Sequence, residues 1–279
     1  MSFQCARFPF FHLTATLMKK QVLTFALLLA AGAFSSAQAQ FKLNANSLGA
    51  GLKAAKAATL SDQAVVDYTK EYVAWSDANN PVAPATSPYT KRLQKIVASL
   101  GTYDGMTMNY KVYLVKDVNA FACADGSVRV LAGLMDLMSD QEVLGVIGHE
   151  IGHVKHKDSR DAMRTALLTS ALKEGVSSQG GAAATLSSSQ LGDVGQALAN
   201  ASFSRSQESS ADGYGYELLK AQKVNPWYMA SAFGKLQSLS GGAKSSKTSQ
   251  LFSSHPDTEK RMVAVTERAQ KDGFPKPTN

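Results

Sequence analysis

Cysteine is scarce in this chain, which has 279 residues and only two cysteines, Cys5 and Cys123. Two thiols cannot build a disulfide framework, and they cannot supply the ligands of a structural zinc site made of thiolates. The rest of the composition is that of a globular protein, with 44% hydrophobic and 18% charged residues. A collagen-like or largely disordered chain is therefore excluded, and the length allows one or two domains.

A strong excess of positive charge is also missing once the first 39 residues are set aside. The formal net charge is +7, but residues 1–39 carry three basic side chains and no acidic one, which leaves 26 basic against 22 acidic side chains. No block of basic residues alternates with aromatic ones, as a nucleic-acid-binding surface would require. We therefore expect no nucleic acid among the partners.

Residues 1–39 have the pattern of a cleaved signal peptide. Met18-Lys19-Lys20 is a compact positive region, residues 22–31 are apolar, and Ala37-Gln38-Ala39 offers small side chains for cleavage before Gln40. The apolar stretch is shorter than a membrane-spanning helix requires, and Met18 is an alternative start of the chain. Because no cysteine lies near the cleavage point, lipid attachment there is excluded.

The remaining residues predict an α+β fold that is mostly helical around one small sheet. Alternating β-formers in residues 106–115 and 121–131 predict a hairpin or a short sheet. Ser139 followed by Glu142 is a capping box that opens a helix running to about Asp158. The Gly/Ser/Ala-rich residues 177–196 predict a mobile loop or a weak helix, which we expect over the cleft. Other helices are expected within residues 48–78, with caps at Ser61 and Asp62, and at 91–100, 204–221, 225–239 and 256–271.

The strongest chemical signal is the run His149-Glu150-Ile151-Gly152-His153. Its histidines are four residues apart on a mostly apolar helix, so both imidazoles lie on one face and can bind one tetrahedral metal ion. Glu150 reaches the same cleft without being a ligand, which is the place of a general base for water. Burying these three polar side chains without such a role would be costly.

A catalytic metal needs a third protein ligand, and Glu208 is the best candidate. Glu208 and Asp212 share one face of a predicted helix, so Glu208 can bind the metal while Asp212 accepts the second ring N–H of a histidine ligand. Small residues flank the pair and permit close packing of helices. His156 lies seven residues after His149, about 10 Å along the helix axis, and is interpreted as exposed and incidental.

His255 and Arg261 are candidates for a further catalytic role. His255 precedes Pro256, which suits the first turn of a helix, and Arg261 follows more than one turn later. Either side chain offers a donor for the negative charge of a tetrahedral adduct. For His255 two alternatives stay open: it occupies the open metal position as a gate, or it is packed for structural reasons.

Together these motifs resemble the HtpX-like, CAAX-prenyl-protease-type zinc metallopeptidases, and among them the exported LoiP-like branch. The resemblance covers roughly residues 60–270 and rests on the runs already described and on two more, Asn119-Ala120-Phe121-Ala122 and Val130-x-x-Gly133-Leu134. It implies a gluzincin fold with a small sheet beside the zinc helix. It also implies one zinc ion held by His149, His153 and Glu208, with Glu150 as the catalytic base.

The chain departs from this branch because it lacks the cysteine of a lipoprotein signal, and it lacks the many membrane helices of the prenyl proteases. We therefore expect a single metallopeptidase domain over residues 40–279 in the periplasm, at most peripheral to the outer membrane. Its expected substrates are misfolded or membrane-associated envelope proteins, which would add as a strand along residues 119–124, with contacts to Asn119, Ala120, Phe121 and Ala122. The alternatives are a zinc-dependent chaperone or assembly factor and a noncatalytic binding module.

Overall fold

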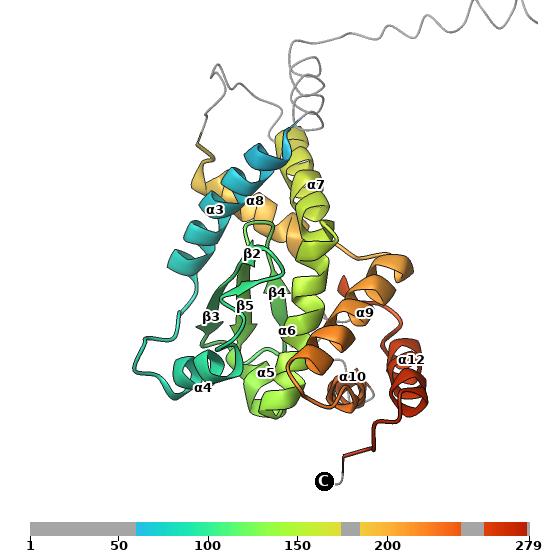
Figure 1. The fold of residues 1–279 in the computed structure, drawn as a ribbon. Coiled ribbons are helices and arrows are strands. Elements are labelled where there is room, and N and C mark those ends of the chain that lie inside the picture. The colour runs from blue at the N-terminus through green and yellow to red at the C-terminus, as the bar shows by residue number, and fades with distance from the viewer. Residues whose placement is uncertain (1–59, 174–184, 241–253, 278–279) are drawn as a thin grey trace, which may run out of the picture. The chain divides into compact units, whose positions relative to one another are not determined.

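Figure 1 shows the computed structural model, in which residues 60–173, 185–240 and 254–277 are described. All of them belong to one compact unit, Asn46–Asn279. The predicted signal peptide and residues 177–184 of the Gly/Ser/Ala-rich segment lie outside the described residues. None of the helices in the described ranges combines the length and the apolar character that crossing a bilayer requires.

A three-stranded sheet stands next to the helix that carries the two histidines. Its strands are β3 (Asn109–Tyr113), β4 (Ala120–Ala122) and β5 (Ser127–Leu131), in the order β3-β5-β4. β5 pairs with β3 in parallel and with β4 in antiparallel orientation, so the expected hairpin is the β4–β5 pair. β5 is buried along its whole length because it is the central strand. A separate two-stranded ribbon joins β1 (Thr102–Tyr103) to β2 (Met106–Thr107).

The β4–β5 turn depends on Gly126, which has a φ of +85°. A Cβ at this position would lie 2.2 Å from the carbonyl oxygen of Thr107. Both observations require glycine here, because other residues rarely adopt this backbone conformation and have no room for a side chain.

Helix α6 (Asp140–Lys155) begins at the predicted capping box. The Ser139 hydroxyl accepts a hydrogen bond from the Glu142 N–H, and the Glu142 carboxylate accepts one from the Ser139 N–H. The helix ends three residues before the expected position. Lys157 adopts a φ of +67° and turns the chain, so Asp158 becomes the first residue of helix α7 (Asp158–Lys173).

Helix α9 (Arg205–Ala221) packs closely against α6 because glycines line the contact. A Cβ on Gly152 would lie 2.9 Å from the Cα of Ala211, and a Cβ on Gly215 would lie 2.9 Å from the backbone nitrogen of His149. Larger side chains would force the two backbones apart. The small residues predicted around Glu208 and Asp212 thus bring these carboxylates to the histidines.

The remaining helices complete two separate hydrophobic clusters. The larger cluster joins the sheet and α6 to α4, α5, α9, α10 and α12, and the smaller one joins α3, α7 and α8 with Cys123. Helix α8 covers the C-terminal part of residues 177–196, for which a mobile loop or a weak helix was predicted. Helix α4 begins three residues before its expected start because Ser87 caps it and Pro88 occupies its first turn. The bounds of these helices are α3 (Asp62–Asn79), α4 (Pro88–Ile96), α5 (Ala132–Leu137), α8 (Ser188–Ala199), α10 (Trp227–Ser240) and α12 (Thr258–Lys271).

Candidate active site

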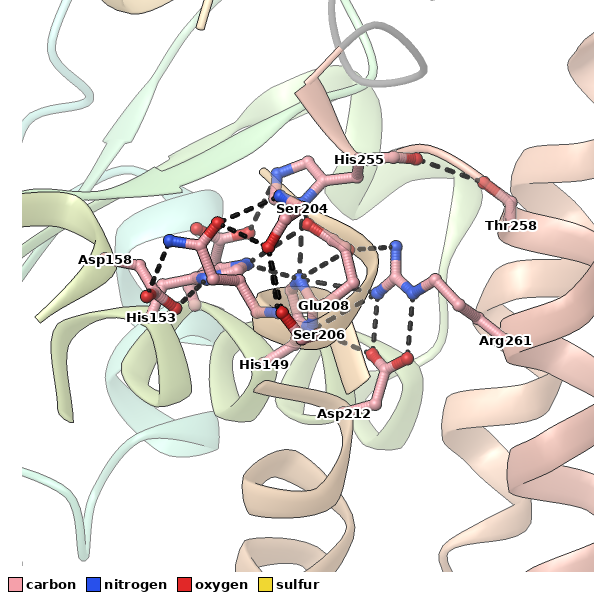
Figure 2. A network of polar contacts seen from close by, with 12 residues as sticks. His149, His153, Asp158, Ser204, Ser206, Glu208, Asp212, His255, Thr258 and Arg261 are labelled. Carbon is pink, nitrogen blue, oxygen red and sulfur yellow. Dashed lines mark hydrogen bonds and ion pairs between the residues drawn. The ribbon is translucent and has the colours of Figure 1, made fainter. Parts of the chain in front are cut away.

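The two histidines of α6 point toward one another across one turn of the helix (Figure 2). The Nε2 atoms of His149 and His153 are 3.1 Å apart, and both rings are buried. The Nδ1 atom of His149 lies 2.9 Å from Asp212 Oδ1, and that of His153 lies 2.9 Å from Asp158 Oδ2. Because an ionised carboxylate can only accept, each Nδ1 carries the ring hydrogen and each Nε2 keeps its lone pair.

Glu208 and His255 approach the same point from α9 and from the residues before α12. Glu208 Oε1 lies 3.5 Å from His153 Nε2, and Glu208 Oε2 lies 3.7 Å from His149 Nε2. The Nδ1 atom of His255 is 3.0 Å from Glu208 Oε1 and 3.3 Å from His149 Nε2. One atom of each of the four residues lies within 4.8 Å of the others, and all four are buried. The predicted ligands are therefore brought together, with His255 added to them.

This arrangement fits a metal ion. Two imidazole lone pairs 3.1 Å apart repel one another unless a cation lies between them. Neighbouring ligands of a tetrahedral zinc ion, each about 2.0–2.1 Å from it, are about 3.3–3.4 Å apart. The observed separations of 3.1, 3.5 and 3.7 Å bracket that value. His156, in contrast, is exposed and takes no part, as expected.

The protonation states of His149 and Glu208 also suit metal ligands. Burial, followed by the positive charge of Arg261, lowers the pKa of His149 to about 3, so this imidazole is neutral at pH 7. Burial alone would raise the pKa of Glu208, but hydrogen bonds with His153 and His255 outweigh it and hold the pKa well below its usual range. A neutral imidazole and an ionised carboxylate are the forms that bind metals.

Glu150 lies beside the ligand cluster without belonging to it. Its Oε1 atom is 3.7 Å from His255 Nε2, and its carboxylate accepts a hydrogen bond from the backbone N–H of Ala122. Burial raises the pKa of Glu150, so the carboxyl group takes up a proton more readily than one in water. This is the property that a general base needs.

Arg261 is committed to the carboxylates behind the ligands. Its Nε and Nη2 atoms donate to the two oxygens of Asp212 at 2.8 and 2.6 Å, and its Nη1 lies 2.5 Å from Glu208 Oε2 (Figure 2). Burial alone would raise the pKa of Asp212, but the hydrogen bonds from Arg261 outweigh burial, so the pKa lies below its usual value. Of the two candidates for stabilising the tetrahedral adduct, His255 lines the cleft beside Glu150, and Arg261 lines a different hollow between α9 and α12.

The cleft beside Glu150 encloses a cavity of about 120 Å³. Its lining includes all four residues predicted to contact substrate, Asn119, Ala120, Phe121 and Ala122. Other lining residues, among them Tyr72, Met163 and Leu198, also belong to the smaller hydrophobic cluster. Gly195, in the described part of the Gly/Ser/Ala-rich segment 177–196, also lines the cavity, so this part of the segment borders the cleft.

Sequence reasoning missed three residues around His153. Asp158 binds the Nδ1 atom of His153, Gln207 binds Asp158, and the ring of Phe203 stacks on the imidazole with the ring centroids 3.9 Å apart. An acidic residue five positions after the second histidine was the available signal. In a helix that continues through Asp158, as the sequence predicts, this side chain would point away from His153.

Two histidines and a glutamate on closely packed helices, with a second glutamate beside them, define a metallopeptidase active site. The model of peptidase family M48 matches residues 84–269, and the chain belongs to this family. It is similar to Metalloprotease LoiP of Escherichia coli strain K12, with 42% identity over 228 residues that cover 81% of this chain and 89% of LoiP.

Two further relatives agree with this assignment. Metalloprotease YcaL of the same strain is 39% identical over 253 residues, which cover 90% of this chain and 98% of YcaL. A Protease HtpX homolog from Fusobacterium nucleatum subsp. nucleatum is 30% identical over 206 residues, or 57% of this chain and 62% of the homolog. The chain is therefore a metal-dependent hydrolase that acts on peptide bonds.

Proposed function

We propose that this protein is an exported zinc endopeptidase that cleaves misfolded or membrane-associated proteins of the cell envelope. The observation that carries the proposal is the convergence of His149, His153 and Glu208 beside Glu150. Zinc is the metal favoured by two imidazoles and one carboxylate in a site that leaves a fourth position to water or substrate.

Glu150 performs the proton transfers in the proposed mechanism. Zinc, when bound by His149, His153 and Glu208, supplies Lewis-acid polarisation of the scissile carbonyl and of the attacking water. The Glu150 carboxylate accepts a proton from that water at an Oε atom and passes it to the leaving amine. His255 Nε2 lies 3.7 Å from Glu150 Oε1, where it can donate to the negatively charged oxygen of the adduct only when its Nδ1 does not occupy the fourth metal position.

The outer edge of β4, which pairs with no other strand in the described part of the chain and where the Ala120 N–H donates to Asn119 Oδ1, supports an extended polypeptide as substrate. Asn119 and Cys123 form their backbone hydrogen bonds with β5, so Ala120 and Ala122 direct their backbone groups away from the sheet. Ala122 reaches Glu150 in this way, which puts the strand edge and the base on one side of the cleft. Pairing through backbone groups selects little for sequence, which suits unfolded or misfolded substrates.

Residues 1–39 support export of the protein to the periplasm, where peripheral contact with the outer membrane would bring it to envelope substrates. The prediction of a soluble exported form follows from the small residues before Gln40 and from the missing lipoprotein cysteine. N-terminal sequencing of protein recovered from the periplasmic fraction tests it. We expect the chain to begin at Gln40, and protein found with an intact N-terminus in the cytoplasm would contradict export.

Cleavage of casein by the purified protein tests the catalytic proposal. We expect the zinc-loaded enzyme to cleave casein, Glu150→Gln to bind zinc but lose cleavage by at least 10²-fold, and the exposed control Glu267→Gln to behave as wild type. Equal background in wild type and Glu150→Gln would reject the endopeptidase and favour a zinc-dependent assembly factor. An envelope phenotype that survives Glu150→Gln would likewise make binding the main role.

A further inference from the structure

His153 has a carboxylate partner that comes from neither of the two helices supplying the predicted ligands. The partner is Asp158, the first residue of α7, whose Oδ2 lies 2.9 Å from His153 Nδ1. The turn at Lys157, with its φ of +67°, places Asp158 there, and both side chains are buried. Figure 2 shows Asp158 on the side of the ring opposite the ligand cluster.

The second oxygen of Asp158 is occupied as well. Gln207 Nε2 donates a hydrogen bond to Asp158 Oδ1 at 2.9 Å. The orientation of this amide is set by the start of α9, because Gln207 Oε1 accepts hydrogen bonds from the backbone N–H and the hydroxyl of Ser204, both at 2.9 Å. The capping box of α9 therefore fixes which end of Gln207 faces Asp158.

We infer that Asp158 and Gln207 are a positioning pair that sets the tautomer of His153 and ties its placement to that of Glu208. Asp158 accepts the Nδ1 hydrogen of His153, which leaves the Nε2 lone pair directed at the ligand cluster. Gln207 precedes Glu208 in the chain, so the hydrogen bond from Gln207 to Asp158 joins the end of α6, the start of α7 and the start of α9. The inference rests on the proposed metal site but not on the proposed substrate.

Counting donors and acceptors shows why Asp158 has to be a carboxylate. Its Oδ2 accepts a hydrogen bond from His153 and its Oδ1 accepts one from Gln207, so both side-chain atoms must be acceptors. An asparagine has one acceptor and one donor. Asp158→Asn would place its NH₂ group against a donor, or would force His153 to carry its hydrogen on Nε2 and lose the lone pair that binds metal.

The same count predicts a compensating change. In the double variant Asp158→Asn with Gln207→Glu, the carboxylate introduced at position 207 accepts a hydrogen bond from the asparagine NH₂. Its other oxygen still accepts the hydrogen bonds from Ser204. The asparagine carbonyl is then free to accept from His153 Nδ1. A residue that only packs at this place would not be rescued by a substitution on another helix.

The test measures zinc affinity by competition with a chelator in the full-length protein, in a Glu150→Gln background that prevents cleavage. We expect Asp158→Asn to weaken zinc binding by 10- to 100-fold, and Asp158→Asn with Gln207→Glu to recover affinity to within about threefold of the parent. The control is Asp161→Asn, one turn further along α7, whose carboxylate pairs with Arg160 and Arg164 at the surface. This control should bind zinc as the parent does.

The absorption spectrum of the cobalt-substituted protein is the second measurement. A changed ligand field in Asp158→Asn that returns to the parental form in the double variant supports the inference. Parental affinity in Asp158→Asn, or a double variant as weak as the single one, overturns it. A wild-type protein that binds zinc in this way but leaves casein intact would reject the proposed peptidase while the positioning pair stands.

Discussion

Gly215 of α9 lies directly against the backbone of His149 on α6, with room for a hydrogen but not for a methyl group. We predict that Gly215→Ala lowers the free energy of unfolding by about 1–3 kcal/mol, because a Cβ 2.9 Å from the His149 nitrogen forces the helices apart. Zinc affinity should fall with it, since α9 carries Glu208. Chemical denaturation and chelator competition measure the two effects.

Gly213 is the matched control on the same helix. The nearest atom to a Cβ at this position is the end of the Arg268 side chain, 4.0 Å away. Gly213→Ala should be neutral or stabilise the protein by up to about 1 kcal/mol, because alanine favours the helix. Equal destabilisation by both substitutions would contradict the role given to close helix packing.

His255→Ala distinguishes the roles left open for this histidine. Its Nδ1 atom lies in the ligand cluster, 3.3 Å from His149 Nε2, where it competes with water for the fourth metal position. We predict that the substitution raises basal casein cleavage several-fold, measured at saturating zinc. The exposed His156→Ala is the control and should leave cleavage unchanged. A loss of 10²-fold or more in kcat would instead identify His255 as the stabiliser of the adduct.

Removal of the metal should destabilise the fold as well as stop catalysis. The ligands converge in a buried site, so a zinc ion that binds only the folded chain would stabilise it by about 4 kcal/mol at a thousand times its Kd. For a domain of this size we predict that a chelator lowers Tm by roughly 8–16 °C and that added zinc restores it. Calorimetry measures this shift. Glu150→Gln should show the same shift because Glu150 is not a ligand, whereas His149→Ala should not show it because a ligand is missing. An unchanged Tm in wild type would count against a resident metal.

We predict that protonation of Asp77 lowers the stability of the fold in acid, independently of the metal site. Burial raises its pKa, but hydrogen bonds from Arg129, Lys111 and Tyr113 outweigh burial and lower the pKa to about 2. A carboxyl group with a lowered pKa stabilises the fold above its unfolded value of about 3.9, and this contribution is lost as the pH falls from about 4 to 2. Urea denaturation across this range should show the decline.

Asp77→Asn should remove most of that pH dependence and cost about 3 kcal/mol at pH 7, because Arg129 is buried and loses its ion-pair partner. Asp67→Asn is the control, since Asp67 forms an exposed pair with Lys70. A decline between pH 4 and 2 that is equally steep in Asp77→Asn would show that other carboxyl groups cause it.

The parts of the site that depend on local sequence patterns were predictable. The four-residue spacing of His149 and His153, the capping box at Ser139 and the shared face of Glu208 and Asp212 all follow from the geometry of a helix. The capping box of α8, formed by Ser187 and Gln190, was equally visible, but the Gly/Ser/Ala composition around it concealed it.

Features that depend on distant contacts were not predictable. Lys157 gave no sign of its left-handed conformation, because lysine has no preference for that region. Its turn decides that Asp158 meets His153, and Gln207 completes the contact from 49 residues away. The parallel pairing of β3 with β5 also joins segments that no local pattern connects.

The position of Arg261 has a consequence for the order in which the enzyme becomes active. Its guanidinium group holds both Asp212 and Glu208, yet it lies 112 residues after His149 in the chain. At 5–20 residues per second, synthesis takes roughly 6–22 s to pass from one to the other. The two histidines and their base emerge well before the arginine that orders their acidic partners. A chain still being made therefore carries both histidines and Glu150 before it contains the arginine that holds Asp212 and Glu208 in place.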